Sequence, residues 1–335
     1  MRRGVALAAG IVVWSSAMVG TGWAHPVSRQ SYVIVLRNSV DAAEKTDQAE
    51  QAGDFQSDFR YTSALKGFAA RLTLAQVKRL RNDPDVQFVS DDRSVRAVGS
   101  VPVATGESVP TGVRRVEAAT ASTVRQASVA NVAVIDTGVS LTHPDLNATS
   151  GANCVTPGAS AADDNGHGTH VAGTIAARNN GAGVVGVVPD TKVYAVKVLD
   201  SSGSGTWSQV ICGIDWVTAN AAGLNIRVAN MSLGGDGLND NSCGSVNADA
   251  LHAAICNSAA AGVTYAVAAG NDGIDFSAFS PANYPEVLAV TAIADSDGAP
   301  GGRGAPPSCF PGESDDFAAS FSNFAIAPTE VNHTI

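Results

Sequence analysis

The sequence predicts an α/β fold, in which a parallel β-sheet with helices on both faces follows a smaller α+β domain. From about residue 113 onward, short runs of Val, Ala and Ile alternate with Ala-rich stretches of helical length. Continuous apolar strands separated by helices indicate a parallel sheet that is covered on both sides. Between residues 31 and 98 the runs follow the order of a βαββαβ plait. A stretch rich in Val, Pro, Gly and Ser, residues 97–112, lacks periodicity and is interpreted as a linker.

Residues 1–24 have the layout of an export signal. Arg2 and Arg3 form a basic start, residues 4–20 are an apolar run, and Ala24 offers a small residue for cleavage. An uncleaved membrane anchor is the alternative, which the Ser and Gly residues of the run disfavour. We therefore expect a secreted, extracellular protein without stable membrane association after signal cleavage.

The next region, residues 25–105, has a predicted folded core at residues 31–98. Apolar runs predict strands at 31–37, 65–73 and 86–95. Polar stretches at 41–53 and 74–84 predict two helices, the second closed by Pro84. A short strand near residues 59–63 would complete the plait.

The remaining residues, 106–335, form the predicted α/β domain. Strands are expected within the apolar runs 131–138, 192–200, 226–235, 264–272 and 287–294. Helices are expected within 170–180, 207–222 and 248–263. Ligands of such sheets meet the carboxyl ends of the strands, so functional side chains are expected directly after them.

Asp136 and His167 are candidate catalytic residues. Asp136 ends an apolar run and precedes Thr-Gly, which places its carboxylate at the edge of a strand. A carboxylate there is costly unless it accepts hydrogen bonds or faces a cation, although an Asp that caps the loop is a second interpretation. His167 begins a predicted helix, where the helix dipole disfavours a charged imidazole and a carboxylate is needed to hold it as a base. Asp136 is the expected partner.

His167 and His170 also suggest a pair of metal ligands. The zinc-protease helix motif needs His at i and i+4 with an intervening Glu, and both features are missing. His170 is therefore interpreted as a packed, hydrogen-bonded structural histidine. A zinc site of Cys-x-x-Cys type is not expected either, because that motif does not occur.

Five segments occur in one order along the chain: VAVIDTG (132–138), HPDL (143–146), NGHGTHVAGT (165–174), NMSLGG (230–235) and AAGN (268–271). In this order and at these approximate separations, residues 106–335 resemble the subtilisin-like serine proteases, and residues 31–98 resemble the inhibitory propeptide of that family. The resemblance implies a subtilisin-like sheet behind a ferredoxin-like prodomain. It also implies polypeptide substrates, no organic cofactor, and a zymogen in which residues 25–105 act as an intramolecular inhibitor whose tail, residues 100–105, lies in the cleft.

On this resemblance, Asp136 orients His167, His167 is the general base for a serine, and the Asn271 amide stabilises the oxyanion. The family carries its serine in a GTSMA-like turn after these segments, and no such stretch occurs in residues 1–335. Ser204 and Ser232 are not expected to replace it. The sequence as it stands is expected to form no acyl-enzyme, either as an incomplete form of an ordinary protease or as a natural inactive form that retains binding.

The resemblance further implies a substrate groove. Its small side chains leave room for a peptide to lie as an added strand, and for a large apolar or aromatic side chain before the cleaved bond. The alternative is that the glycines only permit turns. The implied strand is Ser232, Leu233, Gly234 and Gly235; the pocket walls are Ala268, Ala269 and Gly270; a second apolar pocket has Trp207 and Val210.

A calcium site is implied as well. Oxygen ligands from a Gly- and Asn-containing loop suit Ca²⁺, although residues 179–183 are alternatively a turn after a helix. Glu107 is expected to reach the site only after cleavage near Gly106. The implied ligands are the side chains of Asp145, Glu107 and Asn180 and the backbone carbonyls of Arg178, Ala182 and Val184.

All five cysteines follow residue 106, and in an oxidising compartment an odd number leaves one unpaired. Cys243 and Cys256 flank a predicted loop and helix and are expected to pair. Cys154 with Cys212 is the second candidate pair. Cys309 is then left over, and the resemblance implies a partner for it beyond residue 335.

Charge excludes one class of partner. From residue 106 onward the chain has 8 Lys and Arg against 21 Asp and Glu, whereas residues 25–105 have 11 and 10. An acidic domain without a basic stripe argues against nucleic-acid binding, and a monomer is expected. Two functions remain: a secreted serine endopeptidase zymogen, and a non-catalytic peptide-binding or inhibitory protein on the same scaffold.

Overall fold

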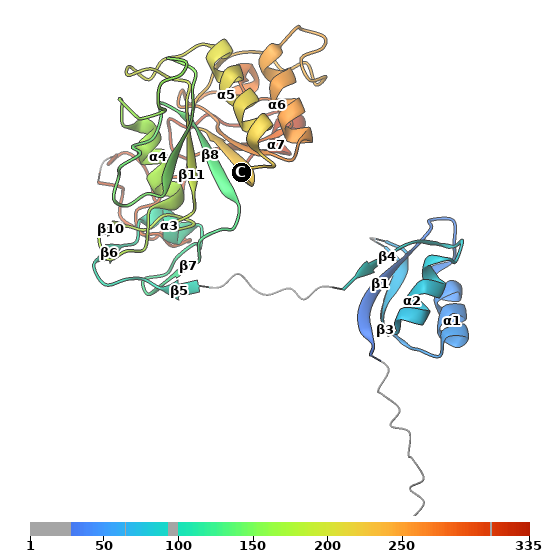
Figure 1. Ribbon diagram of the computed structural model, residues 1–335. Helices are drawn as coiled ribbons and strands as arrows, with labels where there is room; N and C mark the ends of the chain where they lie inside the picture. The colour runs from blue at the N-terminus through green and yellow to red at the C-terminus, as the bar shows by residue number, and fades with distance from the viewer. Residues whose placement is uncertain (1–27, 64, 93–99, 309) are drawn as a thin grey trace, which may run out of the picture. The chain divides into compact units, whose positions relative to one another are not determined.

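The computed structural model describes residues 28–63, 65–92, 100–308 and 310–335, and the chain divides into two compact units, residues 1–96 and 97–335 (Figure 1). The predicted signal sequence and Cys309 lie outside the described residues. None of the helices described is long and apolar enough to span a bilayer.

The smaller unit is the predicted plait. It contains β1 (Gln30–Leu36), α1 (Ala42–Gly53), β2 (Ser57–Tyr61), β3 (Gly67–Leu72), α2 (Leu74–Arg81) and β4 (Val86–Asp91). The strands are antiparallel in the order β2-β3-β1-β4. The short strand is present as well, two residues earlier than predicted.

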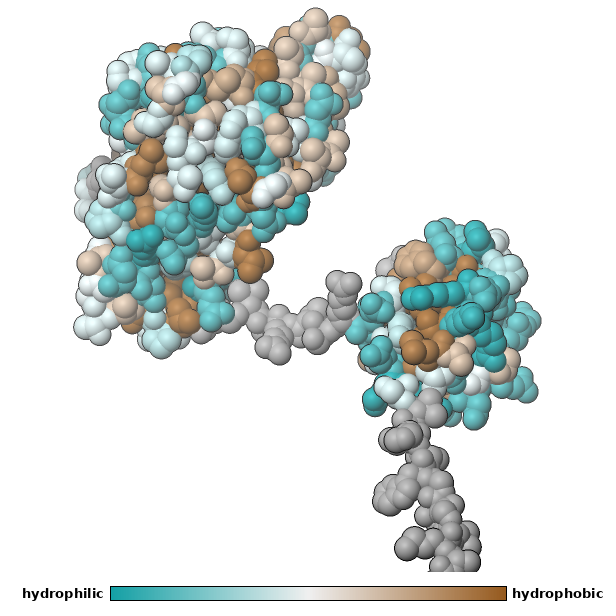
Figure 2. Space-filling model, viewed as in Figure 1, coloured by the Kyte–Doolittle hydropathy of each residue, from teal (hydrophilic) through white to brown (hydrophobic). Residues whose placement is uncertain are grey.

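The two faces of this small sheet differ. One face buries Ile34, Phe68 and Leu72 in a core shared with the helices. On the other face, Phe59 lies opposite Ala69 and Phe88 opposite Val35. Phe59 is 65% exposed and Phe88 52%. Figure 2 shows hydrophobic residues gathered on the visible face of this unit, bordered by hydrophilic ones.

The larger unit is built on a parallel sheet, as predicted, and this sheet has six strands, one more than the five that the sequence predicts. Its strand order is β16-β14-β12-β8-β11-β9. The strands are β8 (Asn131–Asp136), β9 (Ala148–Asn153), β11 (Val193–Lys197), β12 (Ile226–Met231), β14 (Thr264–Ala268) and β16 (Val287–Val290). Shorter elements are β5 (Ser100–Pro102), β6 (Glu107–Ser108), α3 (Thr111–Arg115), β7 (Thr123–Arg125), β10 (Gly183–Val184), β13 (Gly235–Asp236), η1 (Phe276–Ala278), β15 (Phe279–Ser280) and α7 (Pro328–Val331).

Helices cover both faces of this sheet. Helices α5 (Trp207–Asn220) and α6 (Ala250–Ala260) lie side by side (Figure 1) and pack on the face that carries Ile135 and Val196. Helix α4 (His167–Ala176) packs with Val134 and Ala195, which point to the opposite face because side chains alternate along a strand. The sheet therefore has the predicted two helical layers.

The placement of residues 100–105 differs from the prediction. They do not line the cavity that contains His167; instead β5 pairs antiparallel with β7. The Ala104 N–H donates to Asn179 Oδ1 at 2.7 Å, and Asn179 Nδ2 donates to the Pro102 carbonyl at 2.8 Å. In the continuous chain this segment finds its backbone partners within its own unit, so a position in the cleft is not needed to satisfy them.

Candidate active site

The structure brings Asp136 and His167 together. Asp136 is the last residue of β8 and its side chain is fully buried, whereas His167 is the first residue of α4 and its side chain is 49% exposed. His167 Nδ1 lies 2.8 Å from Asp136 Oδ1, within hydrogen-bond distance. With the proton on Nδ1, this bond leaves Nε2 without a hydrogen-bond partner among the described residues and available as a base.

Burial raises the pKa of Asp136, and the hydrogen bonds from His167 and from the Thr137 N–H act against this rise. The Thr137 bond measures 2.7 Å. Asp136 Oδ2 is buried and accepts no hydrogen bond from the residues described. The imidazole is therefore a principal stabiliser of this carboxylate.

Asp163, which the sequence analysis did not single out, organises the start of α4. Its Oδ1 accepts the N–H groups of Asn165 and Gly166 at 3.0 and 2.9 Å, and its Oδ2 accepts the Thr169 N–H at 3.0 Å. Burial acts to raise the pKa of Asp163, but these bonds outweigh it and lower the pKa to about 2. An Asp three residues before a Gly at a helix start is a recognisable capping signal.

Thr137 and Gly168 fix the distance between β8 and α4. The Thr137 hydroxyl donates to Asp163 Oδ1 at 2.9 Å and accepts the Gly168 N–H at 3.0 Å. A Cβ on Gly168 would lie 2.1 Å from the Gly138 carbonyl oxygen. Only glycine permits this close approach, which sets His167 against Asp136.

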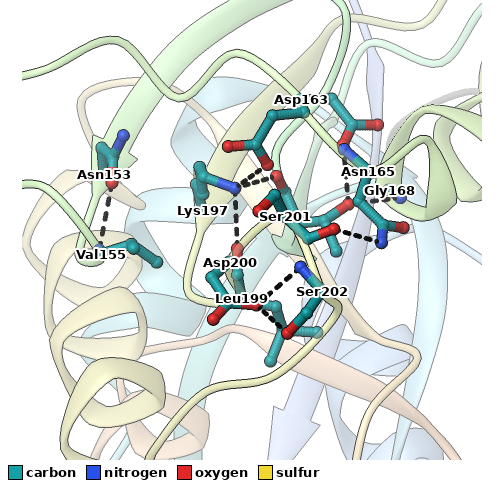
Figure 3. A network of polar contacts seen from close by, with 12 residues as sticks. Asn153, Val155, Asp163, Asn165, Gly168, Lys197, Leu199, Asp200, Ser201 and Ser202 are labelled. Carbon is teal, nitrogen blue, oxygen red and sulfur yellow. Dashed lines mark hydrogen bonds and ion pairs between the residues drawn. The ribbon is translucent and has the colours of Figure 1, made fainter.

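A buried lysine supports the same region from the neighbouring strand (Figure 3). Lys197 is opposite Asp136 in the register of β11 and β8 and is 4% exposed. Its Nζ donates to the carbonyls of Thr137 and Leu199 at 2.7 and 2.8 Å and pairs with Asp164 at 2.6 Å. Lys197 thus ties together the loop after β8, the approach to α4 and the loop after β11. Its only sequence signal was a charge inside an apolar run.

A cavity of about 910 Å³ lies beside His167. Ser204 and Ser232 line it too, but neither forms a hydrogen bond with the imidazole among the described residues. The cavity therefore joins the candidate base to most of the groove that the sequence predicts, namely Trp207, Val210, Ser232, Leu233, Gly234 and Gly235.

The glycines of this groove have a packing reason. A Cβ on Gly234 would lie 2.3 Å from the Phe279 ring, and one on Gly235 would lie 3.2 Å from Trp207. Gly235 pairs with Ser280 where β13 meets β15. Turn formation alone does not account for these glycines.

The predicted pocket walls Ala268, Ala269 and Gly270 are not among the residues that line this cavity. Ala269 is buried and packs in the core. The neighbouring Asn271 is exposed in the loop after β14. Their roles stay predictions.

That loop has an anchor that the sequence analysis missed. The fully buried Asn323 accepts the N–H groups of Asp272 and Ile274 through Oδ1, at 2.9 and 3.2 Å. Its own N–H donates to the Gly270 carbonyl at 3.0 Å. Asn323 therefore fixes the backbone on both sides of Asn271.

The predicted calcium ligands lie together. Glu107 Oε1 accepts the N–H groups of Asn180 and Gly181 at 2.6 and 2.7 Å, while its Oε2 is buried without a partner among the described residues. Asn180 Nδ2 donates to Asp145 Oδ1 at 2.9 Å. Burial and the nearby charge of Glu107 raise the pKa of Asp145. A cation would relieve both the unpartnered oxygen and the carboxylate repulsion, so the residues present fit one.

The prediction that Glu107 reaches this site only after cleavage near Gly106 is wrong. Its carboxylate already lies on the 180–182 loop in the continuous chain, because β6 pairs with β10 and brings residue 107 opposite Gly183. No cleavage near Gly106 is needed. Arg178 and Ala182 lie in the segment between α4 and β10, and Val184 lies in β10.

The interpretation of His170 is also wrong. Its side chain is exposed and forms no hydrogen bond among the described residues, and it lines a second cavity of about 1140 Å³. The buried face of α4 carries Gly168, Ala172 and Ala176, and His170, two residues after Gly168, points away from that face.

Both predicted disulfides are present. Cys154 bonds to Cys212, and Cys243 bonds to Cys256.

Comparisons with known proteins point to one family. A family model described as "Subtilase family" matches residues 128–332, and one described as "Peptidase inhibitor I9" matches residues 31–97. Subtilisin E of Bacillus subtilis (strain 168) is 38% identical over 279 residues, which cover 81% of this chain and 67% of that protein. An extracellular serine proteinase of Thermus sp. (strain Rt41A) is 38% identical over 246 residues, which cover 71% and 54%. The crystal structure of a cold adapted subtilisin-like serine proteinase is 33% identical with a TM-score of 0.42, over 58% of this chain and 59% of that one. The chain thus spans about two thirds or less of these relatives.

Proposed function

Because the chain belongs to the subtilase family, we propose that it is a secreted serine endopeptidase made as a zymogen, in which His167 is the general base and Asp136 orients it. One observation carries this proposal: the buried carboxylate of Asp136 holds the imidazole of His167 at 2.8 Å, beside an open groove. A pair with a purely structural role would not need a half-exposed imidazole that lines such a groove.

The chemistry follows from this pair. Asp136 fixes the tautomer with the proton on Nδ1, so that Nε2 takes the proton of a serine hydroxyl as it attacks the peptide carbonyl. His167 then returns the proton to the leaving amine. The Asn271 side chain is placed in the loop that Asn323 anchors, and its amide would donate to the developing oxyanion. A peptide would lie along Ser232–Gly235.

The serine of this mechanism is not among residues 1–335. We therefore expect these residues to bind peptides in the groove without forming an acyl-enzyme. The alternative function, a non-catalytic peptide-binding or inhibitory protein, has the same groove and differs only in the absence of the nucleophile from the native product.

We assign residues 25–105 as the intramolecular inhibitor. The exposed side chains of Phe59 and Phe88, on the sheet face that the helices leave uncovered, support a docking role, because large exposed apolar side chains on one face indicate an interaction surface. The small unit is nearly neutral in charge and the larger one acidic, so shape and strand pairing would dominate over charge.

We also propose that Glu107, Asp145 and Asn180 hold a structural Ca²⁺. The unpartnered, buried Glu107 Oε2 and its charge repulsion with Asp145 support this assignment. Bound calcium would neutralise these carboxylates and stiffen the 180–184 loop.

A fluorophosphonate probe, which labels an activated serine, tests the enzymatic role. The native secreted product should be labelled, and residues 1–335 alone should not. His167→Ala in the native product should abolish labelling, whereas His170→Ala, an exposed residue on the same helix, should leave it unchanged. A native product that binds peptides in the groove but is never labelled would favour the non-catalytic alternative. A GTSMA-like segment encoded downstream of Ile335 in the genomic DNA would favour the enzyme.

A further inference from the structure

We propose that Cys243, His252, Cys256 and Glu286 form a zinc site when the Cys243–Cys256 disulfide is reduced. One ligand atom from each of these four side chains lies within 4.8 Å of the others. Thiolates, imidazoles and carboxylates are all zinc ligands, and zinc in structural sites takes four of them in a tetrahedron. This site lies apart from the groove and does not depend on the proposed protease function.

The backbone already presents these four groups to one point. His252 and Cys256 are four residues apart on α6, so their side chains share a face of the helix. Glu286 directly precedes β16, and Cys243 lies in the loop between β13 and α6. Three separate segments of the larger unit therefore meet here.

Two separations between candidate ligand atoms are close to those of a zinc centre. His252 Nε2 lies 2.9 Å from Glu286 Oε2, and Cys243 Sγ lies 3.8 Å from Glu286 Oε1. Zinc bond lengths of about 2.0–2.3 Å place neighbouring tetrahedral ligands roughly 3.3–3.8 Å apart. Opening the S–S bond and small side-chain rotations would bring all four atoms to such distances.

A second carboxylate, that of Asp240, lies beside the other ring nitrogen of His252. His252 is fully buried and stacks on the Tyr284 ring at 4.1 Å between centroids. Its Nδ1 faces Asp240 Oδ1 at 3.4 Å and has no hydrogen-bond partner among the described residues. Zinc-binding histidines commonly direct their second nitrogen to a carboxylate, which fixes the ring and raises its basicity. Asp240 occupies that position and is itself held by the N–H groups of Ser242 and Gly244.

The reaction balances with a dithiol as reductant. The dithiol is oxidised to its own disulfide, and its two hydrogens convert Cys243–Cys256 to two thiols. Zn²⁺ then binds both sulfurs and releases their two protons. The disulfide and the metal thus exclude each other, and either one holds the loop of residues 237–249 on α6. Because this loop follows Ser232–Gly235, the groove edge would keep its support under reducing conditions.

Metal content tests the proposal in the full chain carrying Cys309→Ser, which removes the fifth thiol. After reduction with a dithiol, its removal without oxygen and incubation with Zn²⁺, the reduced chain should hold about one zinc ion more than the oxidised chain. Co²⁺ in place of zinc should give the visible bands of tetrahedral cobalt and a thiolate-to-cobalt charge-transfer band. This comparison needs no substitution within the site.

Matched variants locate the metal. Cys154→Ser with Cys212→Ser removes the other disulfide and should leave the extra zinc in place. Cys243→Ser with Cys256→Ser should lose it, and Asp240→Asn should weaken the affinity by about 10- to 100-fold. Circular dichroism checks that each variant is folded. Equal zinc in the reduced and oxidised chains, or undiminished zinc in the Cys243 and Cys256 double variant, would overturn the proposal.

Discussion

Replacing Asp163 by Asn should destabilise the larger unit, although Asp163 lies outside the proposed chemistry. The amide nitrogen that replaces one carboxylate oxygen donates hydrogen bonds and cannot accept one. It would therefore leave either the Thr169 N–H and hydroxyl, or the N–H groups of Asn165 and Gly166, without an acceptor. Losing charge-assisted bonds and leaving donors unpaired costs about 2–3 kcal/mol.

The pKa gives a second route to the magnitude. Hydrogen bonds outweigh burial and lower the pKa of Asp163 from 3.8 to about 2, which corresponds to at most ~2.4 kcal/mol at about 1.36 kcal/mol per unit. Since the side chain is partly exposed, solvent screening reduces this to about 1–2 kcal/mol.

The lowered pKa of Asp163 also sets how its contribution to stability changes with pH. A folded-state pKa below the unfolded one stabilises the fold above the unfolded pKa, and this stability is lost as the pH falls towards 2. Roughly half of the contribution is gone by pH 3.

Urea unfolding at pH 7 and pH 3 measures the stability lost in Asp163→Asn and its dependence on pH. The fluorescence of Trp207 and Trp216 reports the unfolding of the larger unit. The deficit of Asp163→Asn should be largest at pH 7 and clearly smaller at pH 3. Asp272→Asn is the matched control, because that exposed carboxylate accepts no hydrogen bond among the described residues. A deficit that is absent at pH 7, or equal at both pH values, would refute the reasoning.

Three further outcomes are expected. Lys197→Met should lower the free energy of unfolding by about 2–4 kcal/mol, because two carbonyls lose their donor. Asp164→Asn should lower it by less, since Asp164 is half exposed. Urea unfolding of both variants measures the two losses. EDTA should lower the thermal midpoint of the wild-type chain but not of Glu107→Gln, and an unchanged midpoint in the wild type would remove the calcium site. Leu288 and Val290, 39% and 41% exposed on β16, should lower solubility, so that replacing both with Thr should raise the concentration at which the chain stays in solution; no gain would count against this.

Strands with strong apolar signals were predictable. β8 and β11 are continuous Val- and Ala-rich runs, and their parallel pairing placed Asp136 at the edge where His167 is found. β9 carried no such signal, because its residues, ATSGAN, are small or polar and lie at the edge of the sheet, where few apolar contacts are needed.

The supporting residues were harder to predict because their partners come from distant parts of the chain. Lys197 is buried only because Asp164 and two carbonyls from separate loops meet around its amine. Asn323 follows Gly270 by more than fifty residues, and its contact with the loop of Asn271 needs the folded sheet to exist. The contact of Glu107 with residues 180–182 was wrongly made dependent on cleavage, because the short β6–β10 pairing left no signal in the sequence.

The chain around Gly106 is held on both sides. Asn179 Oδ1 accepts the N–H of Ala104, and the N–H groups of Asn180 and Gly181 donate to the carboxylate of Glu107. A protease binds several consecutive residues in an extended conformation before it cuts. Cleavage near Gly106 would therefore require the hydrogen bonds of Ala104 and Glu107 to break first. Local unfolding of this segment, and not hydrolysis of the peptide bond, would then limit the rate of activation. A calcium ion bound to Glu107 would slow that unfolding and so delay activation.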